Sequence, residues 1–251
     1  MVLVAKTTAK KVKRTTHVGM TLVPHGRKHG GRTPEEWLEL WSKWFVKNDR
    51  DAMNENENVR DGYVMLRGQM RSGYDTLTSG YDTLTSGYDT PLVLPLNINS
   101  DTIICFPLLC TLSSKTWEMG RKSDLDTDAK LKKDAEKDND YRMMHSVSVT
   151  FDGDSIIDWS STVDQQKVVN RAVTTPPFNI DVDPGDWNDY EGPLKKEIDG
   201  IVLTPGKARA LCNGTLFLAK LESRESAYVL RFRAGGVRKY SIHAIYTIKV
   251  K

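Results

Sequence analysis

The chain is poor in cysteine and has no long hydrophobic run, and each shortage excludes a class of protein. It holds three cysteines, Cys105, Cys110 and Cys212, without a CxxC pair, which argues against a disulfide framework and against a zinc site. We expect them to be buried thiols in a reducing compartment. No run of about eighteen apolar residues is present, so we expect no membrane-spanning helix. Residues 1–5 are apolar but too few for a signal peptide.

The motifs of common catalytic sites are also missing. There is no GxSxG, no HExxH, no phosphate loop and no dinucleotide fingerprint. His17, His25 and His29 lie in a segment where we expect no scaffold to orient a general base. His145 and His243 stand singly in strand-like segments and are expected to be structural. The sequence therefore predicts no catalytic residue and a protein that is not an enzyme.

Acidic residues are absent from residues 1–32, which nevertheless contain eight cations. These are Lys6, Lys10, Lys11, Lys13, Arg14, Arg27, Lys28 and Arg32. The whole chain has 36 lysines and arginines and 33 acids. Residues 33–251 therefore keep 28 cations and all 33 acids, a net charge of −5. A basic tail on a mildly acidic body is typical of a nucleic-acid-binding arm.

We therefore expect residues 1–32 to form a separate flexible arm that contributes nothing to the core. Lysine, threonine, glycine and histidine dominate it, and no apolar period runs through it, so it is expected to be extended or disordered without a partner. A solvated tail that only aids solubility is the alternative.

One amphipathic helix is predicted directly after this arm. Thr33-Pro34-Glu35-Glu36 has the order of an N-cap, a proline at the first helical position and a capping-box glutamate. Apolar residues then recur at helical spacing over residues 33–47, as Trp37, Leu40, Trp41, Trp44 and Phe45. This stripe predicts packing on the chain's own sheet or, alternatively, docking onto a neighbouring subunit.

The remainder of the chain is typical of β-structure. From Pro91 onward, apolar and alternating segments are separated by turn signals, and the cleanest alternation lies at residues 238–250. A tandem Ser-Gly-Tyr-Asp-Thr-Leu-Thr repeat at 72–90 is expected to be a surface loop lengthened by duplication. The charged stretch 121–142 is expected to be a solvated helix or a long loop. The pattern predicts a mainly β fold, a single jelly-roll β-sandwich over residues 33–251.

An acidic segment at 181–192 is rich in oxygen ligands without matching an EF-hand. Asp181, Asp183 and Asp186 are its candidate Ca²⁺ ligands. Asp186 occupies the sixth position, where that loop needs glycine, and Gly192 the twelfth, where it needs glutamate. An ordinary acidic loop is the simpler interpretation, a Ca²⁺ site at a subunit interface is the alternative, and no other cofactor is predicted. The sequon at Asn213 is discounted because no secretory signal is visible.

This layout resembles the coat proteins of small icosahedral single-stranded DNA or RNA viruses. The shared features are the acid-free basic arm and one β-rich domain of 219 residues without catalytic motifs. The resemblance implies a shell of many copies of the chain, found in the virion and, during assembly, in the host nucleus or cytoplasm. It also implies an arm that projects inward onto the genome. The lysine- and histidine-rich arm and the Trp-rich helix depart from the family pattern; that helix is a candidate clamp between subunits.

In a coat protein, eight cations per copy would neutralise phosphates without reading sequence, and many copies on a shell would retain nucleic acid strongly.

Two other functions stay open at this stage. A monomeric nucleic-acid- or ribosome-associated protein would need basic patches on its body. A ligand-binding β-sandwich would need a cleft with convergent polar groups. The cluster at residues 10–14 also resembles a nuclear localisation signal.

Overall fold

The computed structural model shows a mainly β fold made of two sheets, which confirms the predicted fold class at this level. It describes residues 16–17, 19–47, 59–60, 62–66, 92–114, 127–138, 144–158, 170–182, 206–236 and 241–251. The tandem repeat at 72–90 lies outside the described residues. Within those ranges, neither helix has the length and apolar character needed to cross a bilayer.

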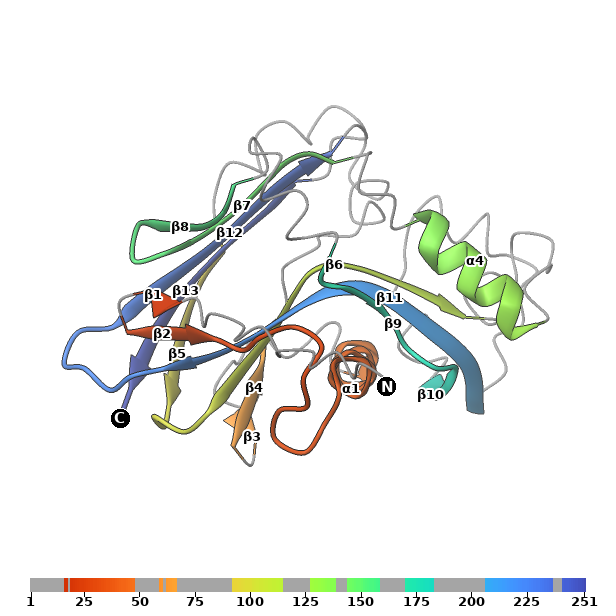
Figure 1. Cartoon of the computed structure of the whole chain (residues 1–251), viewed down its shortest axis with the longest axis horizontal. Helices are drawn as coiled ribbons and strands as arrows, with labels where there is room; N and C mark the ends of the chain where they lie inside the picture. The colour runs from red at the N-terminus through yellow and green to blue at the C-terminus, as the bar shows by residue number, and fades with distance from the viewer. Residues whose placement is uncertain are drawn as a thin grey trace, which may run out of the picture.

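The larger sheet, here called sheet A, is built on two long antiparallel strands, β6 (Ile103–Ser114) and β11 (Gly206–Leu221). Its other strands are β1 (Thr16–His17), β2 (Met20–Leu22), β3 (Val59–Arg60), β4 (Tyr63–Met65), β9 (Ala172–Thr174) and β10 (Phe178–Val182). β4 pairs with one edge of β6 and carries β3. The opposite edge of β11 is met in turn by β10, β9 and β2 (Figure 1). The long strand β11 therefore gathers segments from distant parts of the chain.

The smaller sheet, here called sheet B, has the order β5-β13-β12-β7-β8. Its strands are β5 (Leu92–Ile98), β7 (Met144–Phe151), β8 (Asp154–Asp158), β12 (Tyr228–Gly236) and β13 (Ser241–Val250). All of its pairings are antiparallel except β5 with β13. In sheet A the pairing of β4 with β6 is also parallel.

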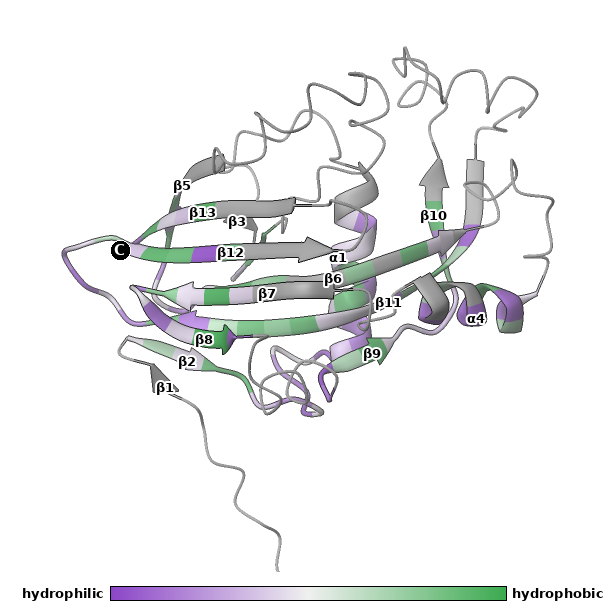
Figure 2. Ribbon diagram, turned by 90° about the horizontal axis from the view of Figure 1, so that it is seen from above, coloured by the Kyte–Doolittle hydropathy of each residue, from purple (hydrophilic) through white to green (hydrophobic). Residues whose placement is uncertain are grey.

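The main core lies between the two sheets and is rich in aromatic rings. Phe106 stacks on Phe217 with ring centroids 5.3 Å apart, and Phe232 of sheet B meets Phe106 edge-on at 5.2 Å. Phe151 stacks on Tyr228 at 4.9 Å. Each of these side chains is at most 1% exposed, and burying a phenylalanine is worth about 1.5–3 kcal/mol. Figure 2 shows the corresponding hydrophobic colouring along the described strands.

A second core lies on the outer face of sheet A, under α1 (Pro34–Lys47). β6 supplies both cores by alternation, and a register shift interrupts its pairing with β11: Thr215 is opposite Leu109, but Leu216 is opposite Pro107. On one side of this bulge Cys105 faces α1, and beyond it Cys110 does. Because these two cysteines are five positions apart, strict alternation would place them on opposite faces, and the bulge brings them to the same face.

The second helix, α4 (Asp128–Asp138), covers the far end of β11 on the side of sheet A opposite α1 (Figure 1). Its apolar contact among the described residues is small and is formed by Leu131 and Ala135 on Leu211. A bidentate ion pair between Arg209 and Asp128 adds to this, with Nη2 2.7 Å from Oδ2. The charged stretch at 121–142 thus contains a helix with a narrow buried side.

The domain boundary predicted at residue 32 is wrong, because residues 19–32 belong to the folded body. β2 pairs with β11, opposing Leu22 to Ala219, and the Val23 amide donates to the Leu218 carbonyl at 2.8 Å. Met20 and Leu22 are 1% and 5% exposed and lie in the core between the sheets. Two apolar residues amid polar ones give no visible period, and their burial depends on the partner strand.

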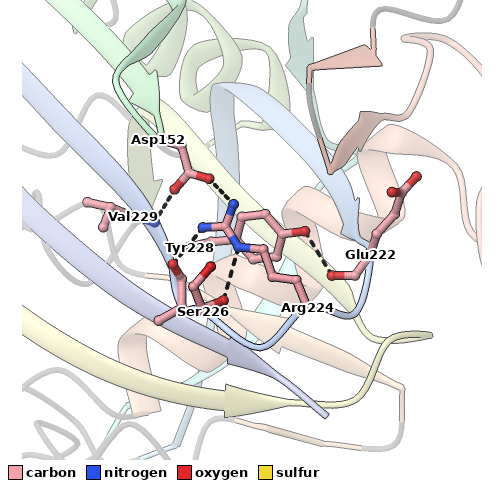
Figure 3. Close-up of polar contacts among 7 residues, drawn as sticks. Asp152, Glu222, Arg224, Ser226, Tyr228 and Val229 are labelled. Carbon is pink, nitrogen blue, oxygen red and sulfur yellow. Dashed lines mark hydrogen bonds and ion pairs between the residues drawn. The ribbon is translucent and has the colours of Figure 1, made fainter.

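The turn between β11 and β12, which joins the two sheets, is held by Arg224, whose guanidinium contacts several partners (Figure 3). The Arg224 guanidinium lies 3.5 Å above the Tyr228 ring, and its Nη1 pairs with Asp152 at 2.5 Å. Nε and Nη2 donate to the carbonyls of Ser226 and Ala227 at 3.0 and 2.6 Å. Asp152 belongs to the β7–β8 turn, so this contact fixes the turn of one hairpin against the crossover.

The same turn seats the hairpin of β1 and β2. Tyr228 donates its hydroxyl to the Glu222 carbonyl at 3.0 Å, and the Glu222 amide donates to the Gly19 carbonyl at 2.9 Å. Gly19 has a φ of 79°, and a Cβ there would stand 2.3 Å from the Tyr228 hydroxyl oxygen. Glycine is therefore required at this position for conformation and for space.

We predict that Gly19→Ala destabilises the fold more than Gly26→Ala. Both glycines have a φ of 79°, but a Cβ at Gly26 would meet nothing within 4 Å. The shared backbone strain is about 1–3 kcal/mol, and only Gly19→Ala adds displacement of the Tyr228 ring. Urea unfolding measures both variants. Equal losses would contradict the seating of the hairpin on Tyr228.

Candidate nucleic-acid interface

The structure divides the predicted basic arm in two. Lys6, Lys10, Lys11, Lys13 and Arg14 lie outside the described residues, whereas Arg27, Lys28 and Arg32 lie in a folded loop. Arg27 and Lys28 are exposed. Arg32 is half-buried, with its guanidinium carbon 5.2 Å from the Trp37 ring centroid and 5.8 Å from that of Tyr63. Three of the eight predicted cations thus have fixed places on the body.

This loop, residues 23–33, is held down by the helix that follows it. His29 and Arg32 exchange backbone hydrogen bonds of 2.8 and 3.1 Å, and the Trp37 indole donates to the His29 carbonyl at 2.9 Å. At the helix start, Thr33 and Glu36 form the predicted capping box, with the Thr33 amide 2.6 Å from Glu36 Oε2. The loop is therefore ordered by side chains of its own neighbour.

The tryptophan stripe packs on this chain's own sheet. Trp37, Trp41 and Trp44 belong to the core under α1, and Leu40 is partly buried against it. The Trp41 indole donates to the Leu66 carbonyl at 2.9 Å, just beyond β4. The side chain of Phe45 lies outside the described residues. The stripe therefore positions the basic loop and β4 instead of standing free for a neighbouring subunit.

Two cations of the body join the loop, and sequence reasoning missed both. Arg171 directly precedes β9, is half-buried, and has its guanidinium carbon 4.8 Å from the Phe217 ring centroid. Lys220 lies on β11, close enough to His29 to lower the pKa of that imidazole. Each is a single cation in a strand-like stretch, so only the topology of sheet A shows that they meet residues 23–33.

The histidines of the loop are held towards their neutral form. Partial desolvation, and then the charge of Arg171, lower the pKa of His25 below 6.5, while Glu35 acts in the opposite direction. Desolvation and then Lys220 lower the pKa of His29. Nε2 of His29 is buried without a hydrogen-bond partner in the described part of the chain. Protonation of either imidazole would add a charge beside an existing cation.

Together these side chains form what we call the basic patch. Its members are His25, Arg27, Lys28, His29, Arg32, Arg171 and Lys220. The acids of α1 are partly engaged within the helix, because Glu36 caps it and Glu39 pairs with Lys43 at 2.6 Å. Glu35 is the acid nearest His25. This arrangement brings the charges of Arg27, Lys28, Arg32, Arg171 and Lys220 onto neighbouring segments, and we assign it no reaction chemistry.

The other candidate sites identified in the sequence do not form a site in the described residues. Asp181 lies in β10 opposite Lys207, whereas Asp183 and Asp186 fall outside the described ranges. No group of three metal-ligating side chains gathers among the residues that are described. Asn213 is 7% exposed in β11 and donates its side-chain amide to Thr174 at 2.8 Å. Its sequon is therefore inaccessible in the folded chain.

The three cysteines are free thiols in the core under α1. Cys105 and Cys212 are buried, and Cys110 is partly buried. Desolvation raises the pKa of Cys105, and desolvation followed by the neighbouring Cys212 raises that of Cys110. A raised pKa disfavours the thiolate, so these two cysteines are poor nucleophiles and poor metal ligands.

We predict that lowering the pH from about 7.5 to about 5.5 destabilises the fold. Because the folded pKa values of His25 and His29 lie below 6.5, the unfolded chain binds more protons in this window. The stability that these two histidines contribute is therefore fully present above pH 6.5. It is lost as the pH falls towards their pKa values in the folded chain. The melting temperature should decrease, and His29→Asn should flatten the decrease. An identical pH dependence in variant and wild type would contradict the buried imidazole.

Folding brings basic residues from separate parts of the sequence together at this candidate interface. Residues from the N-terminal segment, the approach to β9 and β11 converge on one edge and the adjoining outer face of sheet A. Comparison with protein-family models, with curated proteins and with solved structures finds no match for the chain.

Proposed function

We propose that this chain is a viral coat protein that assembles into an icosahedral shell and packages single-stranded nucleic acid through its basic N-terminal segment. The observation behind the proposal is the charge division: eight cations without one acid in residues 1–32, followed by a net charge of −5 in residues 33–251. The folded end of that segment adds a defined attachment to the body. In this role the protein is structural, is found in the virion, and has no catalytic site.

The attachment makes the arm suitable for repeated use on a shell. The β1–β2 hairpin lies on the edge of sheet A and is seated by Gly19 on Tyr228. The cations at positions 10–14 are thus within a few residues of a fixed point in every copy. On a closed shell, such arms converge on one enclosed polyanion, and multivalency strengthens the retention that one arm alone would lack.

The fold is compatible with the proposal at the level of a two-sheet β-sandwich. A jelly roll is an antiparallel architecture, whereas β4–β6 and β5–β13 are parallel pairs. The jelly-roll strand order therefore stays a prediction for this chain. Because α1 is occupied by its own sheet, subunit contacts in a shell would use other surfaces, and we place the basic patch towards the genome.

One observation favours a second candidate, a monomeric nucleic-acid-associated protein. Such a protein needs cations on its folded body, and the basic patch supplies them through Arg171 and Lys220. The two candidates differ in size in solution. A coat protein forms large oligomers or closed shells on a sizing column and under negative-stain microscopy. A sharp monomer peak at assembly concentrations, with nucleic acid present, would contradict the coat function and support the second candidate.

We predict that replacing Lys10, Lys11, Lys13 and Arg14 by Gln weakens binding to single strands without destabilising the fold. If all eight cations contact phosphates, the slope of log affinity against log salt is about −5 to −6, and four neutralisations reduce its magnitude by about 2.8. Fluorescence anisotropy with an oligonucleotide measures the slope.

The matched control neutralises four exposed cations of the body, Lys133, Arg231, Lys249 and Lys251. This control should leave the salt slope close to that of the wild type. Equal effects of the two quadruple variants would show that binding follows net charge alone and would contradict the role of the arm.

A further inference from the structure

We propose that Arg171 is the centre of a phosphate seat on the folded body, where the backbone of single-stranded nucleic acid docks beside the point at which the basic arm leaves. This inference rests on the proposed nucleic-acid-binding function and deepens it. It assigns a fixed contact to the body, in addition to the contacts of the N-terminal cations.

The first reason is the place of Arg171 on the edge of β11. β9 covers this edge up to Thr215, which opposes Ala172, and β2 with Val23 covers it from Leu218 onward. Only Leu216 and Phe217 remain between the two segments in the described residues. Arg171 stands at this interval, with its guanidinium over Phe217. The contact with the Phe217 ring thus gives this side chain a defined position on the edge.

The second reason is that the charge of Arg171 has no acidic partner among the described residues. Two other arginines show the contrast: Arg209 pairs with Asp128, and Arg224 pairs with Asp152. Partly burying an unpaired charge is unfavourable, and desolvation correspondingly lowers the pKa of Arg171. A guanidinium that lies over a ring can keep N–H groups available, and their planar fork matches phosphate oxygens.

The third reason is that other basic residues lie near Arg171. His25 is close enough to feel its charge, and Arg27 and Lys28 are exposed in the same loop. The groups that influence His25 are Arg171 and Glu35, with opposite signs. A phosphate on Arg171 would compensate the repulsion that arises between Arg171 and His25 when His25 is protonated. Glu35 limits the seat on the side of α1, so a strand is expected to approach along the edge of sheet A.

The seat and the arm lie along one line of the molecule. β2 covers Ala219 to Leu221 of β11, and Arg171 stands at Leu216 and Phe217 on the same edge. At about 3.4 Å per residue, five residues of strand span roughly 17 Å. A nucleic-acid strand that is bound by the arm would therefore reach the seat within a few nucleotides.

The test uses the full chain, a labelled twenty-nucleotide oligothymidylate and anisotropy titrations over a range of KCl concentrations. Arg171→Gln should weaken binding about tenfold, as expected for loss of a hydrogen bond to a charged group. It should also reduce the magnitude of the salt slope by about 0.7. Arg171→Lys should restore the slope but only part of the affinity, because it keeps the charge and loses the fork.

The matched control is Arg231→Gln, which removes one exposed arginine from β12 of sheet B and should leave both quantities unchanged. If Arg171→Gln fails to fold, the double variant Arg27→Gln and Lys28→Gln tests the same seat from its exposed side. It should lower the magnitude of the slope by about 1.4, and an unchanged slope would overturn the seat.

The outcomes separate the two proposals. If the wild-type chain does not bind the oligonucleotide, the proposed function fails. If it binds, and Arg171→Gln behaves like Arg231→Gln, the function stands and the phosphate seat is overturned. Inorganic phosphate distinguishes the source of the ligand. Stabilisation by phosphate over chloride at equal ionic strength that disappears in Arg171→Gln, with oligonucleotide binding unaffected, would assign the seat to free phosphate and overturn the nucleic-acid assignment.

Discussion

The pairing of β11 with β6 is the constraint on which the rest of the structure depends. The two faces of β11 serve different cores: Phe217 and Ala219 face sheet B, whereas Leu216 and Leu218 face α1. A slip of one residue would exchange these faces and place each set of side chains in the core that is shaped for the other. The bulge opposite Thr215 and Leu216 accommodates the extra residue of β6, so that the two strands keep matching faces along their length. The edge of β11 that faces away from β6 pairs with β10, β9 and β2. The register of β11 therefore determines the positions of Arg171 and Lys220, the two cations that sheet A contributes to the basic patch.

The packing of the N-terminal segment on sheet A determines where the charged residues lie. The N-terminal segment is cationic throughout, yet its second half is tied into the sheet by Met20 and Leu22. The body as a whole is acidic, but folding places Arg171 and Lys220 beside residues 25–32. The change from cationic to anionic sequence at residue 32 is therefore not the place where the folded part begins. The folded molecule thus places the loop that carries Arg27, Lys28 and Arg32 against Arg171 and Lys220 of sheet A.

What could be predicted from the sequence was set by local signals. The capping box at Thr33 and Glu36 and the spacing of the tryptophans predicted a helix over 33–47, and α1 runs from Pro34 to Lys47. Alternation at 238–250 predicted the strand found at 241–250. These features are visible because each residue acts on neighbours a few positions away.

What could not be predicted depends on contacts between distant segments. The strand β2 has only two buried residues and owes its formation to β11. Arg171 and His25 are far apart in the sequence, and they meet because β9 and the loop after β2 leave the same edge of the same strand. The candidate Ca²⁺ ligands at 183 and 186 and the repeat at 72–90 fall outside the described residues, so those expectations stay predictions.

The position of Arg171 has a consequence for unwanted association. An open strand edge offers unpaired N–H and C=O groups, to which another polypeptide can add and begin to aggregate. β10, β9 and β2 tile most of this edge of β11, and the short interval left among the described residues is where the guanidinium stands. A cation there discourages strand addition by foreign β-segments, since an incoming backbone would have to displace a charged side chain. One arginine at this opening would thus oppose the addition of another strand and leave its charge for the phosphate that we propose.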